Sequence, residues 1–239
     1  MTRTKSAGKS TSHGAGRNRT CMAVLLGYVA LVWPLFTCAA EPATVSFSLD
    51  FPASDPAQYT ISVQSDGHAH YECSAKVSPD SDERDLYQTD FTFSDATRAR
   101  VFDLAAQAHY FSGRIDSGNH KIAFTGVKKL VYKDGQRNSS AEFNYSSVPA
   151  VQQLTSLFQN IAATLEYGRR LTHYHRYQKL ALSDELKRME DQARAGDLGE
   201  LDAVRSVLQD IYDDQSVINV VRARAQRIME MAKGSSATR

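Results

Sequence analysis

The fold is decided by residues 59–77, whose sequence is YTISVQSDGHAHYECSAKV. Apolar and polar side chains alternate on both sides of residues 65–67, which is typical of strands with one buried face. A two-residue turn at Asp66-Gly67 would mix apolar and polar side chains on one face. A three-residue turn over 65–67 leaves one face wholly apolar and puts Gly67 where a positive φ is needed. The sequence therefore predicts a β-hairpin with the cross-strand pairs Val63–Ala69, Ile61–Tyr71 and Tyr59–Cys73.

More strand patterns lie on both sides of this hairpin. They are short and alternate in the same way, and they occupy residues 45–49, 86–93, 121–124, 129–133 and 141–145. Among them, residues 95–109 repeat apolar side chains at helical spacing, and Ser94 precedes them as a helix N-cap. This order predicts an α+β domain over 41–167, with an antiparallel sheet and a flanking helix.

From Pro149 onward the pattern is helical. Residues 149–165 carry one apolar stripe with proline in the first turn, and we expect this helix to cover the sheet. Residues 168–239 are predicted to form a helical C-terminal region that ends in a hairpin of helices at 201–212 and 216–232. The sequence leaves open whether Gly168 divides one long helix, and whether the hairpin packs on the sheet domain or on a partner.

Residues 1–40 differ in composition from the rest of the chain. Residues 1–20 contain five basic residues and no acidic one, and residues 21–40, CMAVLLGYVALVWPLFTCAA, contain no charge. A basic stretch before an uncharged apolar segment is typical of an export signal. We therefore expect the remainder of the chain to be exported, to the periplasm or the outside of the cell.

This leader has more than one possible fate. The small residues Cys38 and Ala40 permit a signal peptidase to cleave after Ala40. An uncleaved segment would instead anchor the protein to the inner membrane, and we expect membrane contact only through residues 21–40 in that case. Lipidation of Cys38 is disfavoured because Thr37 stands where a bacterial lipoprotein signal normally has a small residue.

The expected exported part has a balanced charge. Residues 41–239 contain 23 basic and 27 acidic residues, which gives a net charge of −4. A protein that binds a phosphate backbone usually carries one-sided positive charge, so we expect no nucleic-acid partner. Cys73 is the single cysteine of this part, so it forms no internal disulfide and is expected to be a small buried side chain.

One group of residues has the chemistry of a metal site. Alternation puts His68, His70 and Glu72 on the same face of the second hairpin strand, where two histidines and a carboxylate could converge on Zn²⁺. A further ligand from His109 or His120 would complete the site of a metal-dependent hydrolase. The same three residues also fit the wet face of a half-exposed strand, which needs no cofactor.

A second pair of histidines, His173 and His175, predicts no metal site. Two residues apart on a helix, they point in directions about 200° apart. The aromatic and arginine residues around them could meet an acidic partner or anionic lipid. The acidic residues that follow favour a solvated helix face instead.

The sequence contains no catalytic motif in a fitting context. Gly-x-Ser-x-Gly, His-Glu-x-x-His and Gly-x-Gly-x-x-Gly are absent, and the GKST of residues 8–11 lacks the rest of a phosphate-binding loop. We therefore expect an exported, non-enzymatic binding or structural protein of the cell envelope, without a cofactor, whose partner is an unidentified protein or small ligand. The alternative is a metal-dependent hydrolase that uses the His-x-His-x-Glu strand and zinc.

Overall fold

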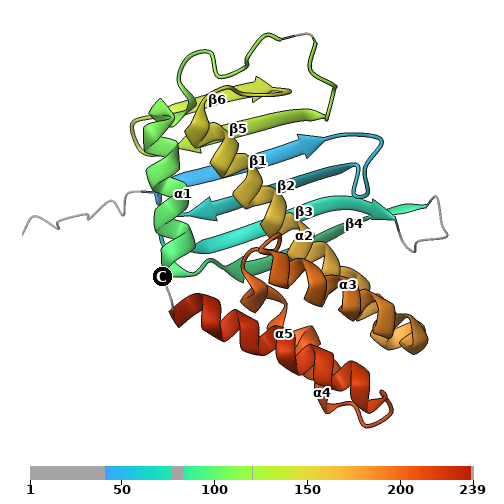
Figure 1. The fold of residues 1–239 in the computed structure, drawn as a ribbon. Coiled ribbons are helices and arrows are strands. Elements are labelled where there is room, and N and C mark those ends of the chain that lie inside the picture. The colour runs from blue at the N-terminus through green and yellow to red at the C-terminus, as the bar shows by residue number, and fades with distance from the viewer. Residues whose placement is uncertain (1–40, 77–82, 120, 238–239) are drawn as a thin grey trace, which may run out of the picture. The chain divides into compact units, whose positions relative to one another are not determined.

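The computed structural model describes residues 41–76, 83–119 and 121–237, with side chains described through residue 233. The predicted leader, residues 1–40, lies outside this range, as does His120. The described chain is α+β (Figure 1). Within it, a six-stranded antiparallel sheet has the order β4-β3-β2-β1-β5-β6, with the strands β1 Thr44–Asp50, β2 Gln58–Gln64, β3 His68–Lys76, β4 Arg84–Thr92, β5 Val127–Lys133 and β6 Asn138–Phe143.

The central hairpin has the predicted register. Its core-facing pairs are Tyr59–Cys73, Ile61–Tyr71 and Val63–Ala69, and Gly67 has a φ of 96°. These six side chains are all buried. The alternate residues of β2 and β3 point to the opposite face, which no helix covers in Figure 1. The prediction from alternation is therefore confirmed.

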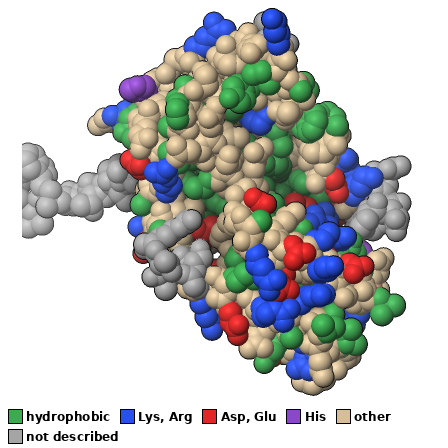
Figure 2. Space-filling model, in the orientation of Figure 1, with side chains coloured by type: hydrophobic (Ala, Val, Ile, Leu, Met, Phe, Trp, Pro, Cys, Tyr) green, Lys and Arg blue, Asp and Glu red, His purple; other side chains and the backbone are tan. Residues whose placement is uncertain are grey.

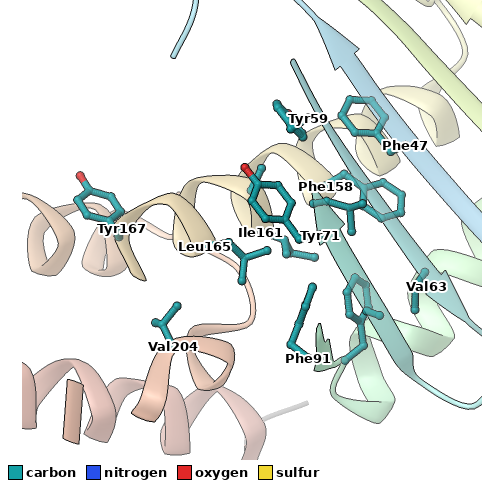
Figure 3. Packing of buried hydrophobic residues seen from close by; sticks show 14 of the residues in the cluster. Phe47, Tyr59, Val63, Tyr71, Phe91, Phe158, Ile161, Leu165, Tyr167 and Val204 are labelled. Atoms are coloured by element: carbon teal, nitrogen blue, oxygen red, sulfur yellow. The ribbon is translucent and has the colours of Figure 1, made fainter. Parts of the chain in front are cut away.

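Two helices cover the apolar face of the sheet, α1 (Asp95–Gln107) and α2 (Pro149–Tyr177) (Figure 1). Ser94 is the N-cap of α1, as predicted, because its hydroxyl accepts a hydrogen bond from the backbone N–H of Thr97. The ring of Phe158 on α2 stacks on Phe47 of β1, with 5.5 Å between centroids (Figure 3). The longest helix thus supplies the aromatic centre of the core.

Gly168 does not divide α2. A Cβ atom at this position would lie 2.5 Å from a methyl carbon of Val204, so only glycine admits the short helix η3 (Leu201–Val204) at this distance. The border expected between the sheet domain and the helical region at 167 therefore falls inside a continuous helix. The described residues from 41 onward belong to one compact unit and share a hydrophobic core, so we expect residues 41–239 to fold without the preceding residues.

The C-terminal region follows α2 through the short helix η2 (Lys179–Ala181). It contains α3 (Leu182–Ala195), α4 (Arg205–Asp213) and α5 (Asn219–Ala237). The sequence left open what the α4–α5 hairpin packs on. In the structure it packs on α2 and α3. The prediction that Ser216 caps the last helix is wrong, because α5 begins at Asn219 and the Ser216 hydroxyl donates to Asp214. No helix in the described part of the chain is long and apolar enough to cross a membrane.

The strand predicted at 121–124 is absent from the structure. This segment is irregular, and the side chain of Asn144 hydrogen-bonds to the backbone of Ala123 and Thr125. Phe124 is 59% exposed, so the alternation there does not mark a buried face. The side chain of Asn144 thus forms hydrogen bonds that a neighbouring strand would otherwise form, and the sequence pattern did not predict this.

An unusual turn, η1 (His109–Phe111), follows α1. Its three residues have φ values of 51°, 54° and 62°, in the left-handed region that is unfavourable for residues with side chains. Tyr110 packs on the ring of Tyr132 at 4.6 Å between centroids, and the Arg137 guanidinium lies 4.4 Å from the Tyr110 centroid. Phe111 is fully buried. This packing holds the strained turn in place.

Candidate functional site

The uncovered face of the sheet is polar. Its side chains are arranged in rows that run across all six strands, because each residue lies opposite its partner on the next strand. One such row consists of Gln88, Glu72, Thr60, Ser48, Lys129 and Glu142. The face thus presents hydroxyl, amide and charged groups in a regular array.

A depression of about 510 Å³ lies on this face. It carries three carboxylates, those of Asp50, Glu72 and Glu142, against one ammonium group, that of Lys129. Lys129 pairs with Glu142 at 3.0 Å, so the other two carboxylates leave an excess of negative charge. Its remaining polar side chains are Ser48, Gln58, Thr60 and Ser74, and two exposed apolar residues, Leu86 and Val127, also line it.

The predicted metal ligands His68, His70 and Glu72 lie on this face, as the alternation indicated. Each of the latter two is paired with a residue of β4: His70 Nδ1 lies 2.7 Å from Asp90, and Glu72 accepts a hydrogen bond from Gln88 at 2.8 Å. In the described ranges, no group of three or more His, Cys, Asp or Glu side chains could hold a metal ion. Zinc binding by these residues stays a prediction from the sequence.

The row that contains His70 has the order of a nucleophilic triad. Asp90, His70 and Ser62 are neighbours across β4, β3 and β2. A triad needs the base within hydrogen-bond reach of the hydroxyl. No hydrogen bond joins His70 to Ser62, both of which are described, and Asp90 is 65% exposed. The contact that would activate the serine is not made.

A buried polar network lies on the other side of the sheet, under α2. Glu166 accepts hydrogen bonds from the hydroxyl of Tyr71 at 2.8 Å and from the thiol of Cys73 at 3.3 Å. Arg169, one turn further along α2, donates to Glu166 at 2.9 Å and to the carbonyl of Lys76 at 3.0 Å. The network fixes α2 to β3 through charged hydrogen bonds in a buried setting.

Burial keeps the Cys73 thiol protonated. Burial, with the nearby Glu166 carboxylate, raises the pKa of the Cys73 thiol to about 12. Burial likewise raises the pKa of Tyr71. Because the thiolate is the nucleophilic form, a thiol with so high a pKa takes no part in covalent chemistry near neutral pH. The expectation that Cys73 is a small buried side chain is confirmed.

Two buried glutamates hold the helical region together. Glu185 pairs with Arg170 and Arg188, and Glu190 pairs with Arg194, Arg224 and Arg227. Burial alone would raise the pKa of Glu185, but the hydrogen bonds from Arg188 and Arg170 outweigh it, and the pKa is lowered. The pKa of Glu190 is lowered mainly by the hydrogen bond from Arg227.

Asp214 connects two turns at one end of this region. It receives hydrogen bonds from Lys179 at 2.6 Å and Ser216 at 2.6 Å, and His175 Nε2 lies 2.9 Å away. These contacts, led by that of Lys179, lower the pKa of Asp214. His173 points elsewhere, with its ring against Tyr177, as expected for histidines two positions apart on a helix.

The sequence matches no protein-family model and no curated protein. Sequence reasoning placed the residues of the open face correctly, since their alternation is local. It missed Glu166, although a carboxylate directly after buried Leu165, with Arg169 three positions on, was a signal for a buried pair.

Proposed function

We propose that the chain is an exported, non-enzymatic binding protein of the cell envelope, and that the open sheet face binds its partner. The observation that carries the proposal is the depression on this face, lined by hydrogen-bonding side chains from several strands. The export signal predicted for residues 1–40 supports the location.

The distribution of titratable groups favours binding over catalysis. Catalytic groups with perturbed pKa values usually converge in a cleft. Here the strongly raised pKa values belong to Tyr59, Tyr71 and Cys73, whose side chains are buried on the helix-covered side of the sheet. The depression offers charge and hydrogen bonds on rigid strands, which suits recognition.

Charge complementarity suggests the nature of the partner. Asp50 and Glu72 are hydrogen-bonded to the neutral amides of Gln58 and Gln88, so no cationic side chain neutralises them in these contacts. A positively charged, polar segment of a partner protein would pair with both carboxylates and hydrogen-bond to the hydroxyls between them. Leu86 and Val127 would contact its apolar side-chain stems.

The test uses residues 41–239 and two fluorescent peptides of equal length, one oligolysine and one oligoglutamate. Fluorescence anisotropy at low salt should show binding of the lysine peptide only, and the double substitution Asp50→Asn with Glu72→Gln should weaken it severalfold. Glu230→Gln on α5, far along the chain from the sheet, is the matched control and should bind like the wild type. Equal binding of both peptides, or an unaffected double variant, would show that this face is not the binding surface.

A further inference from the structure

One end of the helical region carries a group of exposed apolar side chains, here called the apolar end. Its members are large and far from covered: Leu180 is 96% exposed, Tyr177 67%, Ile218 64% and Val220 52%. Exposed large apolar groups that gather in one place mark interaction sites more often than scattered ones do. The apolar end comes from two turns, one between α2 and α3 and the other before and within the first turn of α5.

These two turns are held together. Asp214, which precedes α5, is bonded to Lys179 and His175 of the other turn. Lys179 also donates to Ser216, two residues before Ile218. The apolar end is therefore a fixed feature of the fold, since charged hydrogen bonds hold the turns that carry it.

The shape of the apolar end favours a lipid bilayer over a rigid protein as its binding partner. With 96% of its surface exposed, Leu180 projects from the turn. A rigid protein would need a matching pocket for each projecting side chain. The apolar region just beneath lipid headgroups accepts such side chains without one, and tyrosine is enriched at that depth.

The charges next to the apolar end favour an anionic surface. Residues 170–188 contain five basic and two acidic residues, and the second turn adds Asp213 and Asp214. Glu185 is buried between Arg170 and Arg188, and Lys179 pairs with Asp214, which leaves the basic residues Arg176 and Lys187 without an ion pair among the described residues. Figure 2 shows Lys and Arg side chains over the helical region, interspersed with acidic ones, and hydrophobic side chains at its far edge. Cationic groups beside inserted apolar ones are what anionic headgroups attract.

We propose that the apolar end binds the surface of an anionic lipid bilayer, with Leu180 and Ile218 inserted and the basic residues of α2 and α3 at the headgroups. This contact is additional to the membrane contact expected of residues 21–40. It uses a different surface from the open sheet face, so either proposal can fail without the other.

The test uses residues 41–239, because the leader's own apolar segment would bind lipid regardless. The protein is sedimented with vesicles of phosphatidylcholine alone or with about one-third phosphatidylglycerol. We expect binding to the anionic vesicles, and a loss of about tenfold or more in the double variant Leu180→Ser with Ile218→Ser, which removes two large apolar groups. Phe124→Ser with Tyr145→Ser, also exposed and outside both proposed surfaces, is the matched control and should bind like the wild type.

A second pair of changes tests the charge. Arg176→Glu with Lys187→Glu should reduce binding to anionic vesicles and remove the preference for them over neutral ones. The proposal is overturned if the wild type stays in the supernatant with both vesicles, or if both serine variants lose binding equally. It is also overturned if the wild type sediments as a dimer that Leu180→Ser with Ile218→Ser dissociates, since the apolar end would then be a self-association surface.

Discussion

The carboxylate of Glu200 accepts hydrogen bonds from both the backbone N–H and the hydroxyl of Ser94, at 3.0 and 2.7 Å. Ser94 is the N-cap of α1, so this carboxylate lies at the positive end of a helix dipole. Glu200 itself has a φ of 50°, in the left-handed region. The contact ties the segment between α3 and α4 to the start of the helix that covers the sheet.

This relationship predicts a stability effect far from either proposed surface. Glu200→Ala removes both acceptors and should lower the free energy of unfolding by about 1–2 kcal/mol, because the hydrogen bonds involve a charged group at a helix N-terminus. Glu200→Gln keeps one acceptor and should lose less. Urea unfolding followed by circular dichroism measures both, and an alanine variant as stable as the wild type would mean that the contact contributes nothing.

The sequence predicts what is local and misses what depends on distant partners. The register of the β2–β3 hairpin follows from alternation and Gly67, and the start of α1 follows from Ser94, since both signals lie within a few residues. The contact of Glu200 with Ser94 joins residues 106 positions apart, and that of Glu166 with Tyr71 joins residues 95 apart. Such pairs depend on how helices cross the sheet, which no periodicity specifies.

The same reasoning applies to the candidate metal site. Alternation placed His68, His70 and Glu72 on one face correctly, but their neighbours on β4 could not be assigned before the pairing of β3 with β4 was known. That pairing gives His70 the partner Asp90 and gives Glu72 the partner Gln88. The exposed turns of the apolar end show no pattern in the sequence, because exposure of Leu180 is a property of the packed helices.

The buried network under α2 should behave as a coupled pair. Arg169→Met leaves the Glu166 carboxylate buried without its cation and should lower the free energy of unfolding by about 3 kcal/mol. Adding Glu166→Met removes the stranded charge, and the double variant should recover part of that loss. Urea unfolding of the wild type, both single variants and the double variant gives the coupling energy. Additive losses would show that the two residues do not stabilise each other.

The helical region should lose stability in acid. The pKa values of Glu185 and Glu190 are lowered in the folded state, so their contribution is fully present above the ordinary value of 4.5 and is lost as the pH falls through the folded-state values. Urea unfolding at several pH values from about 6 to about 3 should therefore show a steady decrease.

A single substitution should flatten this pH dependence. In Glu190→Gln the titrating group is gone, so the decrease should be smaller, and stability near neutral pH should be lower because three arginines lose their carboxylate. Glu230→Gln on the exposed side of α5 is the control and should follow the wild-type curve. Identical curves for the wild type and Glu190→Gln would contradict the assignment.

The left-handed turn after α1 predicts two substitutions of opposite sign. His109 is exposed and has a φ of 51°, so His109→Gly should relieve backbone strain and raise the free energy of unfolding by about 1 kcal/mol. Gln107, two residues earlier, lies in the last turn of the right-handed helix α1. Gln107→Gly should therefore lower the free energy of unfolding by up to about 1 kcal/mol. Thermal unfolding measures both, and a loss of stability in both variants would show that His109 is not strained.

The placement of the histidine and carboxylate side chains on the open face leads us to expect that zinc does not stabilise the protein. A ligand that binds only the folded state raises the unfolding temperature, and the stabilisation grows with the logarithm of its concentration over its Kd. The Asp90 contact occupies only Nδ1 of His70, and the Gln88 contact only one oxygen of Glu72, so each residue keeps a ligand atom. In the described residues, however, no three His, Cys, Asp or Glu side chains are placed to share one ion, so zinc would have to draw side chains together before it could bind. Thermal unfolding of residues 41–239, without a histidine tag, should therefore give the same midpoint with a chelator and with excess zinc. A midpoint that rises with zinc in the wild type and not in His70→Ala would establish a metal site on β3, and the hydrolase alternative would then take precedence over the binding proposal.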